Sequence, residues 1–530
     1  MKRFFLLLAL FSGTIAMVSS CKDKEDPQTN NKVYAITADR ESVTGIAAES
    51  PSEEVIVITT DAPYWMITSS PAWVKANPTT AEGNGKSTIV TFTIESNNLK
   101  MERSGDVVFV GGKTTLTIGF TQLGKVVVPT NDHFAGGAGT EADPWLISNA
   151  KQLGYVEEEL DNEAKYFKLT ADIDMQDVEW TPINGAEPYS LTINLDGDGK
   201  TISNLGAPLF YDLNGTVKNL NFSKAKVTAK TNVGVLARMI SVGATVRNVN
   251  ISECEVSTDE TGGAAGMVGK IMAKADIEKV KVSNCSMLSN TNYAAGMVGL
   301  VELSEDATVN ISRCCVEGGS VHSTTYYPGG ILGVNNSTAG TVNIKDCYAT
   351  CEVLAESTDN NGRWAGGILG GHIKAGGVTN LENCYATGYV KAFRWGAGGI
   401  VGQVGAAGCS VVRCMAFNSK VEATNDGARY GSGAIVASCV KLPIVVDKCY
   451  RSKNLEFVCP STANTTLFDM EFIPTPANLP LNDEANPNAY YHHGKATDLT
   501  LSALVQNATL AGEAWSGEIW DFSKDYPTLK

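Results

Sequence analysis

The feature that most constrains the fold of this sequence is a repeat of 30 to 37 residues in its second half. A motif of small residues and Gly before an apolar position recurs along this region. The apolar positions are Val235, Met267, Met297, Ile331, Ile368, Ile400 and Ile435. Repeats of this length are typical of a solenoid in which each repeat forms one coil. We therefore predict a stack of coils over residues 233–453.

The composition of each repeat favours strands. Two or three short runs rich in Val, Ile and Thr are joined by Gly, Asn and Asp. β-branched residues fit a pleated sheet, and paired glycines allow the tight corners between the strands of one coil. The predicted fold of this region is a right-handed parallel β-helix, and the predicted class of the whole chain is all-β.

A second motif ends in cysteine and recurs between the apolar positions. Its cysteines are Cys254, Cys285, Cys314, Cys347, Cys384, Cys414 and Cys449. If equivalent positions stack, these side chains form one column with the strand spacing of about 4.8 Å. We expect a mostly reduced column in which Cys acts as a small buried apolar residue. The alternatives are disulfides between Cys347 and Cys351, Cys409 and Cys414, or Cys439 and Cys449.

Both ends of the solenoid need caps, because an open β-helix exposes unpaired backbone groups. Residues 133–232 contain the Gly-rich run 134–140, the run 143–147, a helical-looking stretch at 150–160 and a strand-like run at 195–202. This order resembles the N-terminal cap and first coils of bacterial surface solenoids with GLUG-type repeats. Residues 454–530 are predicted to form the C-terminal cap, since 520–530 resemble the closing strand of those proteins.

A separate domain is predicted at residues 33–124. Alternating runs at 54–60, 87–94, 106–110 and 114–120 are typical of a small antiparallel sandwich. The markers Trp65, Trp73, Asn98, Arg103 and Gln122 resemble the BACON domain, an immunoglobulin-like module of Bacteroidetes surface proteins. The resemblance implies a spacer with a proposed carbohydrate association. The two tryptophans would then be core residues or sugar contacts, and we favour core residues.

The first 20 residues are interpreted as a signal peptide. Lys2 and Arg3 precede an apolar run that is too short and interrupted to span a bilayer. The run ends in Val18-Ser-Ser-Cys21, which resembles a bacterial lipoprotein cleavage box. The resemblance implies cleavage before Cys21 and lipidation of its sulfur. Residues 21–32 form a polar, charged tether that resembles the export signal of Bacteroidetes lipoproteins, which predicts a lipid-anchored protein on the outer-membrane surface.

Charge and residue counts disfavour several classes of function. The formal net charge of −15 disfavours nucleic acid or anionic lipid as a partner. Five scattered histidines form neither a Ser-His-Asp pattern nor a His-x-x-His motif, and there is no Cys-x-x-Cys pair. No catalytic residue, metal or cofactor is therefore assigned. A polysaccharide lyase or glycoside hydrolase stays as an alternative, although the acidic residues lie in loops without a common register.

One set of aromatic residues follows the repeat. Tyr293, Tyr327, Trp364, Trp395 and Tyr430 precede the Gly motif, and Arg363, Arg394 and Arg429 come directly before the last three rings. In a solenoid, one position per repeat becomes one column in space. This column is either a glycan-binding surface of rings and guanidinium groups or an aromatic ladder packed at a corner.

The function predicted from the sequence is a non-enzymatic, glycan-binding or adhesive surface lipoprotein, with the solenoid carried on a sandwich spacer. The predicted partner is a polysaccharide or host glycan, with the lipid anchor holding the protein to the membrane. Two alternatives stay open. One is a polysaccharide-active enzyme of the β-helix fold, and the other is a purely architectural protein or a subunit of a larger complex.

Overall fold

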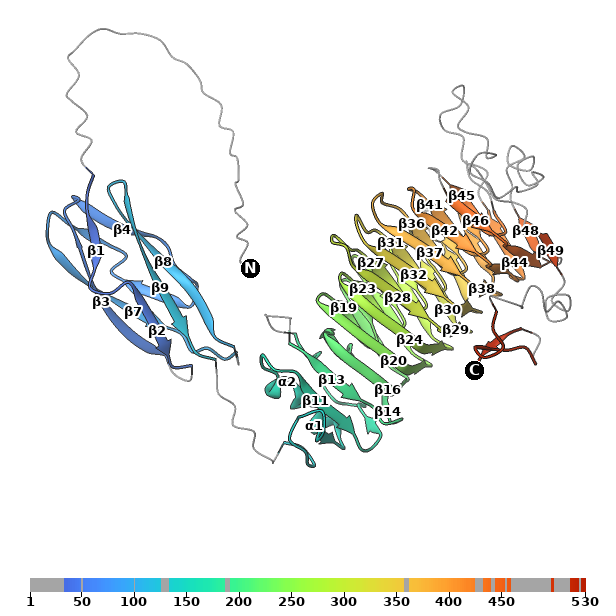
Figure 1. Cartoon of the computed structure of the whole chain (residues 1–530), viewed down its shortest axis with the longest axis horizontal. Coiled ribbons are helices and arrows are strands. Elements are labelled where there is room, and N and C mark those ends of the chain that lie inside the picture. Colours follow the sequence, from blue (N-terminus) through green and yellow to red (C-terminus); the bar gives the residue numbers. More distant parts are fainter. Residues whose placement is uncertain are drawn as a thin grey trace, which may run out of the picture. The chain divides into compact units, whose positions relative to one another are not determined.

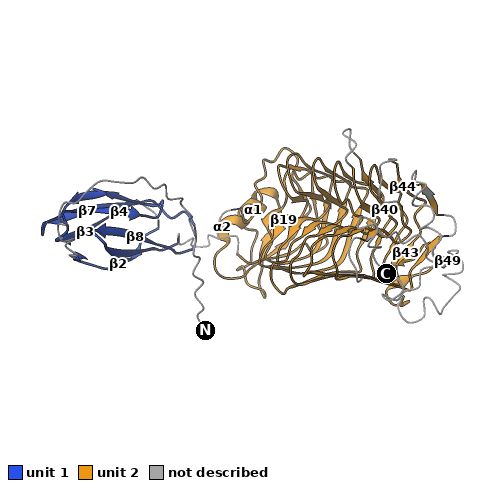
Figure 2. Ribbon diagram, turned by 90° about the horizontal axis from the view of Figure 1, so that it is seen from above, with its two compact units in different colours: residues 1–126 blue, residues 127–530 orange. Residues whose placement is uncertain are grey.

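The computed structural model describes residues 33–48, 51–99, 101–124, 133–185, 191–356, 362–424, 432–439, 444–452, 455–458, 497–499, 515–523 and 526–530. It divides into two compact units, Met1–Val126 and Val127–Lys530 (Figure 2). Cys21, the predicted signal peptide and the tether lie outside the described residues. Among the residues that are described, no helix has the length and apolar character needed to cross a membrane.

The first unit is a β-sandwich, as predicted. One sheet has the order β1 (Ile36–Ala38), β3 (Ser52–Thr60), β7 (Ser87–Ile94) and β5 (Val74–Asn77). The other has the order β2 (Ser42–Ile46), β9 (Thr114–Gln122), β8 (Arg103–Gly111), β4 (Tyr64–Ser69) and β6 (Thr80–Glu82). Alternate residues of the long strands point inward and are buried, which is the pattern of a sheet with one face on a core.

Both tryptophans of this unit have packing roles. Trp65 is fully buried, and its ring lies 5.4 Å from that of Phe109. Trp73 packs against the same core, and the guanidinium of Arg103 lies 4.5 Å from its ring centroid. The BACON-like markers Trp65, Trp73 and Arg103 are therefore part of what holds the sandwich together.

The second unit is a parallel β-solenoid, which confirms the predicted fold class (Figure 1). Its large sheet has 19 strands. They are β10 (Trp145–Ile147), β11 (Lys165–Leu169), β12 (Ile173–Asp174), β13 (Ile193–Asp196), β14 (Thr201–Ser203), β16 (Gly215–Ser223), β20 (Gly243–Ser252), β24 (Lys274–Ser283), β28 (Thr308–Ser312), β29 (Cys315–Glu317), β32 (Thr341–Lys345), β33 (Tyr348–Ala349), β37 (Val378–Glu382), β38 (Tyr385–Ala386), β42 (Cys409–Val412), β43 (Met415–Ala416), β46 (Ile444–Asp447), β47 (Tyr450–Ser452) and β49 (Thr497–Leu499).

Two sheets of eight strands complete the coils. The second sheet is β15 (Phe210–Asp212), β19 (Ala237–Ile240), β23 (Val268–Ile271), β27 (Val298–Val301), β31 (Leu332–Asn335), β36 (Leu369–His372), β41 (Val401–Val404) and β45 (Val436–Cys439). The third sheet is β17 (Lys226–Ala229), β21 (Glu255–Thr258), β25 (Ser286–Ser289), β30 (Ser320–Ser323), β34 (Glu352–Ala355), β39 (Val390–Ala392), β44 (Lys420–Ala423) and β48 (Glu456–Val458). Short strands at one corner are β18 (Val233–Gly234), β22 (Gly263–Ala265), β26 (Tyr293–Ala295), β35 (Ala365–Gly366) and β40 (Ala397–Gly398).

Two short helices precede the first complete coils, α1 (Ala150–Gly154) and α2 (Val156–Glu159). They fall within the stretch that the sequence predicts as helical. Asn149 caps α1, since its side chain accepts a hydrogen bond from the Gln152 backbone N–H. Leu153 and Val156 belong to the same apolar core as the coils, so the helices pack on the first part of the solenoid.

The repeat cysteines form two columns, and the single column predicted from the sequence is wrong. Five of them, Cys314, Cys347, Cys384, Cys414 and Cys449, follow a left-handed residue at a first bend of the large sheet. At this position β24 has Val280, whose N–H lies 3.5 Å from the Cys314 Sγ. Cys254 and Cys285 follow a second bend, five residues further along the coil. All seven are thiols in the structure.

The described end of the chain lies on the outer face of the large sheet. β50 (Trp520–Asp521) and β51 (Thr528–Leu529) pair as an antiparallel hairpin (Figure 1). Trp515 and Trp520 are buried against Tyr348 and Tyr385, and the Tyr385 hydroxyl donates to the Pro527 carbonyl at 2.5 Å. This hairpin, which we call the C-terminal hairpin, therefore forms a second, outside apolar cluster.

Candidate functional site

The predicted aromatic column exists at a corner of the solenoid. Tyr293, Tyr327 and Trp364 occupy equivalent positions of three successive coils, since bridges join Ala295 to Gly329 and Gly329 to Gly366. The ring centroids of Tyr293 and Tyr327 are 6.2 Å apart. Those of Tyr327 and Trp364 are 5.3 Å apart with an interplanar angle of 4°, which is face-to-face stacking.

Trp395 lies one position out of register with these rings. The pairing of Ala365 with Ala397 places it beside Arg363, and the guanidinium lies 3.9 Å from the Trp395 ring centroid. The same guanidinium lies 4.6 Å from the Tyr326 ring centroid, so it is sandwiched between two rings. Arg394 is exposed. Tyr430 and Arg429 lie outside the described residues.

The ring faces of this column are occupied by one another. Trp364 is buried between Tyr327 on one side and Trp395, whose ring meets it edge-on at 4.2 Å. The Tyr327 hydroxyl donates to the Gln403 Oε1 at 2.7 Å, and burial raises the pKa of Tyr327. A sugar ring binds an aromatic residue over an open face, and the stacking described here favours the packing role for the column.

A different surface, on the outer face of the large sheet, carries polar side chains from coil to coil. One register position, which we call the amide column, runs from Asn194 to Ser410. Its members are Asn194, Thr216, Thr245, Asp276, Asn310, Asn343, Asn380 and Ser410. Each Asn amide of the central coils donates to the preceding coil, as Asn343 does to Asn310 at 2.9 Å and Asn380 does to Asn343 at 3.0 Å.

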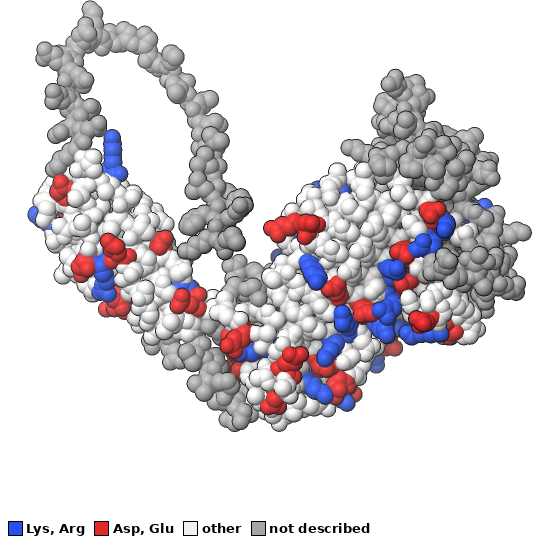
Figure 3. All heavy atoms as spheres, viewed as in Figure 1, with Lys and Arg blue, Asp and Glu red and all other residues white. Residues whose placement is uncertain are grey.

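The next outward position forms a charge column. Its members are Lys168, Asp196, Lys218, Arg247, Glu278, Ser312, Lys345 and Glu382. Glu278 pairs with Arg247 at 3.5 Å and with Arg313, and Glu382 pairs with Lys345 at 3.2 Å and with Arg413. Figure 3 shows the charged side chains gathered in a band across the coils.

The two columns line a groove of about 500 Å³ over the central coils, from Arg247 to Glu382. We call it the polar groove. The amide side chains that line it use one donor and one acceptor within the column. Because an amide group has two N–H donors and two acceptor lone pairs, each retains hydrogen-bonding capacity toward the groove.

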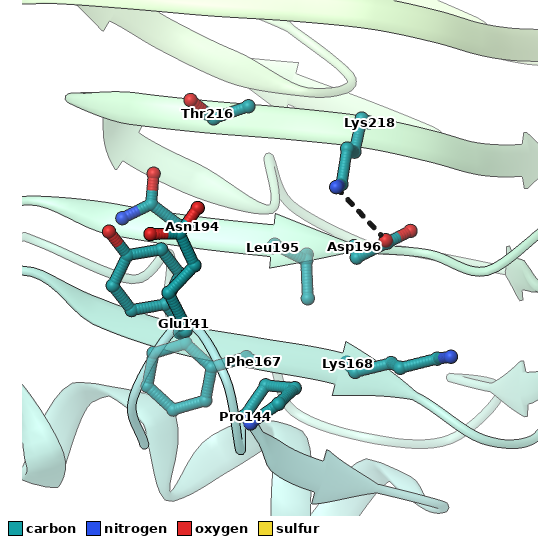
Figure 4. Close-up of a pocket in the computed structure, with 10 residues that line it drawn as sticks. Glu141, Pro144, Phe167, Lys168, Asn194, Leu195, Asp196, Thr216 and Lys218 are labelled. Carbon is teal, nitrogen blue, oxygen red and sulfur yellow. Dashed lines mark ion pairs between the residues drawn. The ribbon is translucent and has the colours of Figure 1, made fainter.

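The same two columns line a pocket of about 300 Å³ beside the first coils (Figure 4). Asn194, Asp196, Thr216 and Lys218 come from β13 and β16, and Glu141 and Pro144 form the opposite side. Lys218 pairs with Asp196 at 3.3 Å. Burial opposes ionisation of Asp196, but hydrogen bonds from the Asp198 backbone and Asn219, together with Lys218, hold its pKa below the usual range.

The chemistry of these surfaces is that of binding. The groove carboxylates Glu278 and Glu382 are ion-paired with cations, and Asp276 accepts a hydrogen bond from Asn310 at 2.8 Å. A general acid in a glycosidase needs a carboxyl group whose protonated form is favoured, and ion pairing has the opposite effect. Within the described ranges, no group of three or more His, Cys, Asp or Glu side chains is arranged to hold a metal ion.

Sequence reasoning missed the polar groove. A signal was present, since Val-Asn-Ile or Thr-Asn-Leu precedes the cysteine at Cys314, Cys347 and Cys384. In a strand, the central residue of such a triplet points away from its two apolar neighbours. Asn310, Asn343 and Asn380 were therefore expected to share one face, while their alignment with the charged positions needed the register of the coils.

Two family models match parts of the chain. Residues 64–123 match the BACON family, described as "Putative binding domain, N-terminal". Residues 156–253 match the N-terminal region of the M26 IgA1-specific metallo-endopeptidases. The second match covers α2, the first strands of the large sheet and the first complete coils. The chain thus combines a BACON domain with a solenoid whose first coils are homologous to that N-terminal region.

Individual relatives cover parts of the chain. Halomucin of Haloquadratum walsbyi is 28% identical over 158 residues, which is 26% of this chain and 2% of halomucin. A solved Bacteroides ovatus structure described as a "putative immunoglobulin A1 protease" is 21% identical, covers 75% of this chain and 95% of its own, and has a TM-score of 0.38. A structure described as "IgA1 Protease" is 14% identical, covers 88% of this chain and 33% of its own, and has a TM-score of 0.37.

Proposed function

We propose that this protein is a non-enzymatic, lipid-anchored surface protein whose solenoid binds an extended glycan along the polar groove. The BACON domain is the spacer between the anchor and the solenoid. The likeness of the repeats to the GLUG type, and of the N-terminus to Bacteroidetes lipoproteins, belongs to this proposal. The homology to IgA1 protease-like proteins and the halomucin match support a place at the cell surface.

The observation that carries the proposal is the continuity of the polar groove. The amide and charge columns present similar chemistry once per coil, at the strand spacing of about 4.8 Å. Hydroxyl groups donate and accept hydrogen bonds, as the Asn310, Asn343 and Asn380 amides do. A linear polymer with hydroxyl groups at regular intervals suits a surface whose donors and acceptors recur at regular intervals.

The groove suits a glycan better than the aromatic column does. Tyr327 and Trp364 cover each other's faces, and Arg363 is held between Tyr326 and Trp395. Binding a sugar there would require these stacked contacts to separate first. We therefore place the glycan on the large sheet and assign the column to packing.

A protease activity of this chain is disfavoured by its sequence. Zinc metallopeptidases of the His-Glu-x-x-His type need two histidines at that spacing, and none of the five histidines has it. The matched model is itself an N-terminal region of those enzymes. A polysaccharide lyase or hydrolase is disfavoured by the ion-paired state of Glu278 and Glu382.

The test applies the purified full chain to a glycan array and compares it with a groove variant, Asn343→Ala with Asn380→Ala. The matched control is Thr228→Ala with Ser257→Ala, which removes an exposed hydroxyl pair, 2.9 Å apart, between two coils of the third sheet. We expect the groove variant to lose at least about tenfold in affinity while the control keeps it. Thermal unfolding of both variants shows whether the coils remain intact. No retention of the parent protein, or equal retention of a folded groove variant, would overturn the proposal.

The anchor has its own test. Substitution of Cys21 by Ala removes the sulfur that carries the lipid. We expect the parent protein in the membrane fraction and accessible to added protease on intact cells, and the variant in the soluble fraction. A variant that stays with the membrane would refute lipidation at this residue.

A further inference from the structure

The C-terminal hairpin closes one side of a second pocket on the large sheet. This pocket of about 450 Å³ lies between β24, β29 and β33 of the coils and residues Glu518, Ile519 and Thr528–Lys530. Arg313 lines both this pocket and the polar groove, so the two are continuous. We call it the hairpin pocket.

The hairpin pocket is cationic in a chain with a net charge of −15. Its lining contains the four cations Lys279, Lys281, Arg313 and Lys530 and the two carboxylates Glu317 and Glu518. Glu317 is already engaged, since Lys281 lies 2.6 Å from it and the Tyr348 hydroxyl donates to it. The polar groove, by contrast, is lined by Arg247, Arg313 and Lys345 against Asp276, Glu278 and Glu382, which balance.

Lys279 is the cation that the coils leave without compensation. It is exposed, it adopts a left-handed backbone conformation with φ of 53°, and among the described residues it has no ion-pair partner. The register places it beside Arg313 of the next coil, because Glu278 pairs with Ser312 and Lys281 with Cys315. Like charges at adjacent strand positions destabilise a sheet, and an anion between them would remove that repulsion.

We propose that the hairpin pocket binds the anionic group of an acidic sugar residue in a glycan that lies along the polar groove. This inference rests on the proposed function and adds the class of glycan. Lys279 and Arg313 hold the carboxylate or sulfate group by charge-assisted hydrogen bonds. Ile519 and the edge of Tyr348 supply apolar surface for the sugar ring, and the glycan continues past Arg313 into the groove.

The variant that tests this is Lys279→Asn. The equivalent residue of the preceding coil is Asn248, which has the same left-handed conformation with φ of 53°, so the substitution removes the charge and keeps the backbone. The matched control is Lys448→Asn, at an exposed left-handed position with φ of 50° in the same bend and outside the pocket lining. Both variants are made in the full chain.

Binding is measured by calorimetry with polygalacturonate as the carboxylated probe, chondroitin sulfate as the probe that also carries sulfate, and dextran as the neutral probe. We expect the parent protein to prefer an acidic probe, and Lys279→Asn to weaken that binding about tenfold while Lys448→Asn leaves it unchanged. The preference should shrink as salt is raised, because exposed charges are screened. Binding of polygalacturonate identifies carboxylate recognition, and binding of chondroitin sulfate alone identifies sulfate recognition.

Two results would overturn the inference in different ways. If dextran binds as well as the acidic probes and Lys279→Asn changes nothing, the glycan-binding function stands and the acidic pocket does not. If none of the probes and no glycan of the array binds, both fail together.

Discussion

At the residue scale, the cysteines make a direct prediction about reactivity. Cys347, Cys351 and Cys414 are buried, and burial raises the pKa of each thiol, to about 12 for Cys351. The thiolate is the form that reacts with iodoacetamide. We expect these three to stay unlabelled in the native protein at pH 8 and to become labelled in guanidinium chloride, as read by peptide mass spectrometry. Labelling of Cys351 in the native state would contradict the buried, protonated assignment.

The same shift gives the sign of a pH effect on stability. The pKa of Cys351 rises from an ordinary 9.0 to about 12 in the folded state, so the folded state holds the proton more tightly. Its contribution to stability is complete below pH 9 and is lost as pH rises toward 12. We expect the free energy of unfolding of the parent protein to fall over this range, and the fall to be smaller in Cys351→Ala. Equal slopes in the two proteins would count against this contribution.

The cysteines also show how far residue-level prediction reached. Their burial and reduced state follow from one recurring motif, but their division into two columns does not. The sequence contained one sign of it, because the apolar marker advances 34 residues from Met297 to Ile331 while the cysteine marker advances only 29 from Cys285 to Cys314. Both bends place a small apolar residue after a left-handed one, so one local motif fits either position.

The corner glycines give a second residue-level prediction. A Cβ on Gly367 would lie 2.0 Å from the Gly399 carbonyl oxygen of the next coil, a contact that needs backbone movement. We expect Gly367→Ala to lower the free energy of unfolding by about 3 kcal/mol. The control is Gly206→Ala, whose Cβ would meet no atom within 4 Å, and it should change stability by less than about 0.5 kcal/mol. Chemical denaturation measures both, and equal stabilities would show that the coils can separate at this corner.

At the element scale, the two arginines that precede tryptophans separate the two interpretations of the aromatic column. Arg363 lies between the Tyr326 and Trp395 rings, whereas Arg394 is exposed. We expect Arg363→Ala to cost about 1 kcal/mol of stability and Arg394→Ala less than about 0.5 kcal/mol, with glycan binding unchanged in both. Thermal unfolding and the array provide the readouts. Loss of glycan binding in a fully stable Arg363→Ala protein would restore the column as a binding surface.

Elements that depend on contacts between distant parts of the chain were the least predictable. The aromatic column was found from spacing, because equivalent positions stack in any solenoid. The position of Trp515 and Trp520 on Tyr348 and Tyr385 could not be found in this way, since the repeat period does not include the hairpin. The hairpin pocket therefore had no signal in the sequence.

At the scale of the whole molecule, the fold class was predictable because two periods reinforce each other. A repeat near 30 residues indicates coils, and alternation within each run indicates strands. The function was less predictable, because a binding surface on a solenoid is assembled from one residue per coil. Asn310, Asn343 and Asn380 are ordinary strand residues one at a time and become a surface only through their register.

The two units have separate apolar cores, which predicts separate unfolding. The sandwich core contains Trp65, Phe92 and Phe109, and the solenoid core contains residues from Phe134 to Leu455. Cooperative unfolding is a property of a shared core, so calorimetry of the full chain should show two transitions. Phe109→Ala, at a fully buried position 5.4 Å from the Trp65 ring, should cost about 3 to 5 kcal/mol and lower only one transition temperature by more than about 10 °C. Gly367→Ala should lower only the other. A single transition that moves with either substitution would show that the spacer and the solenoid unfold as one body, and a rigid stalk would then replace the two-part surface protein proposed above.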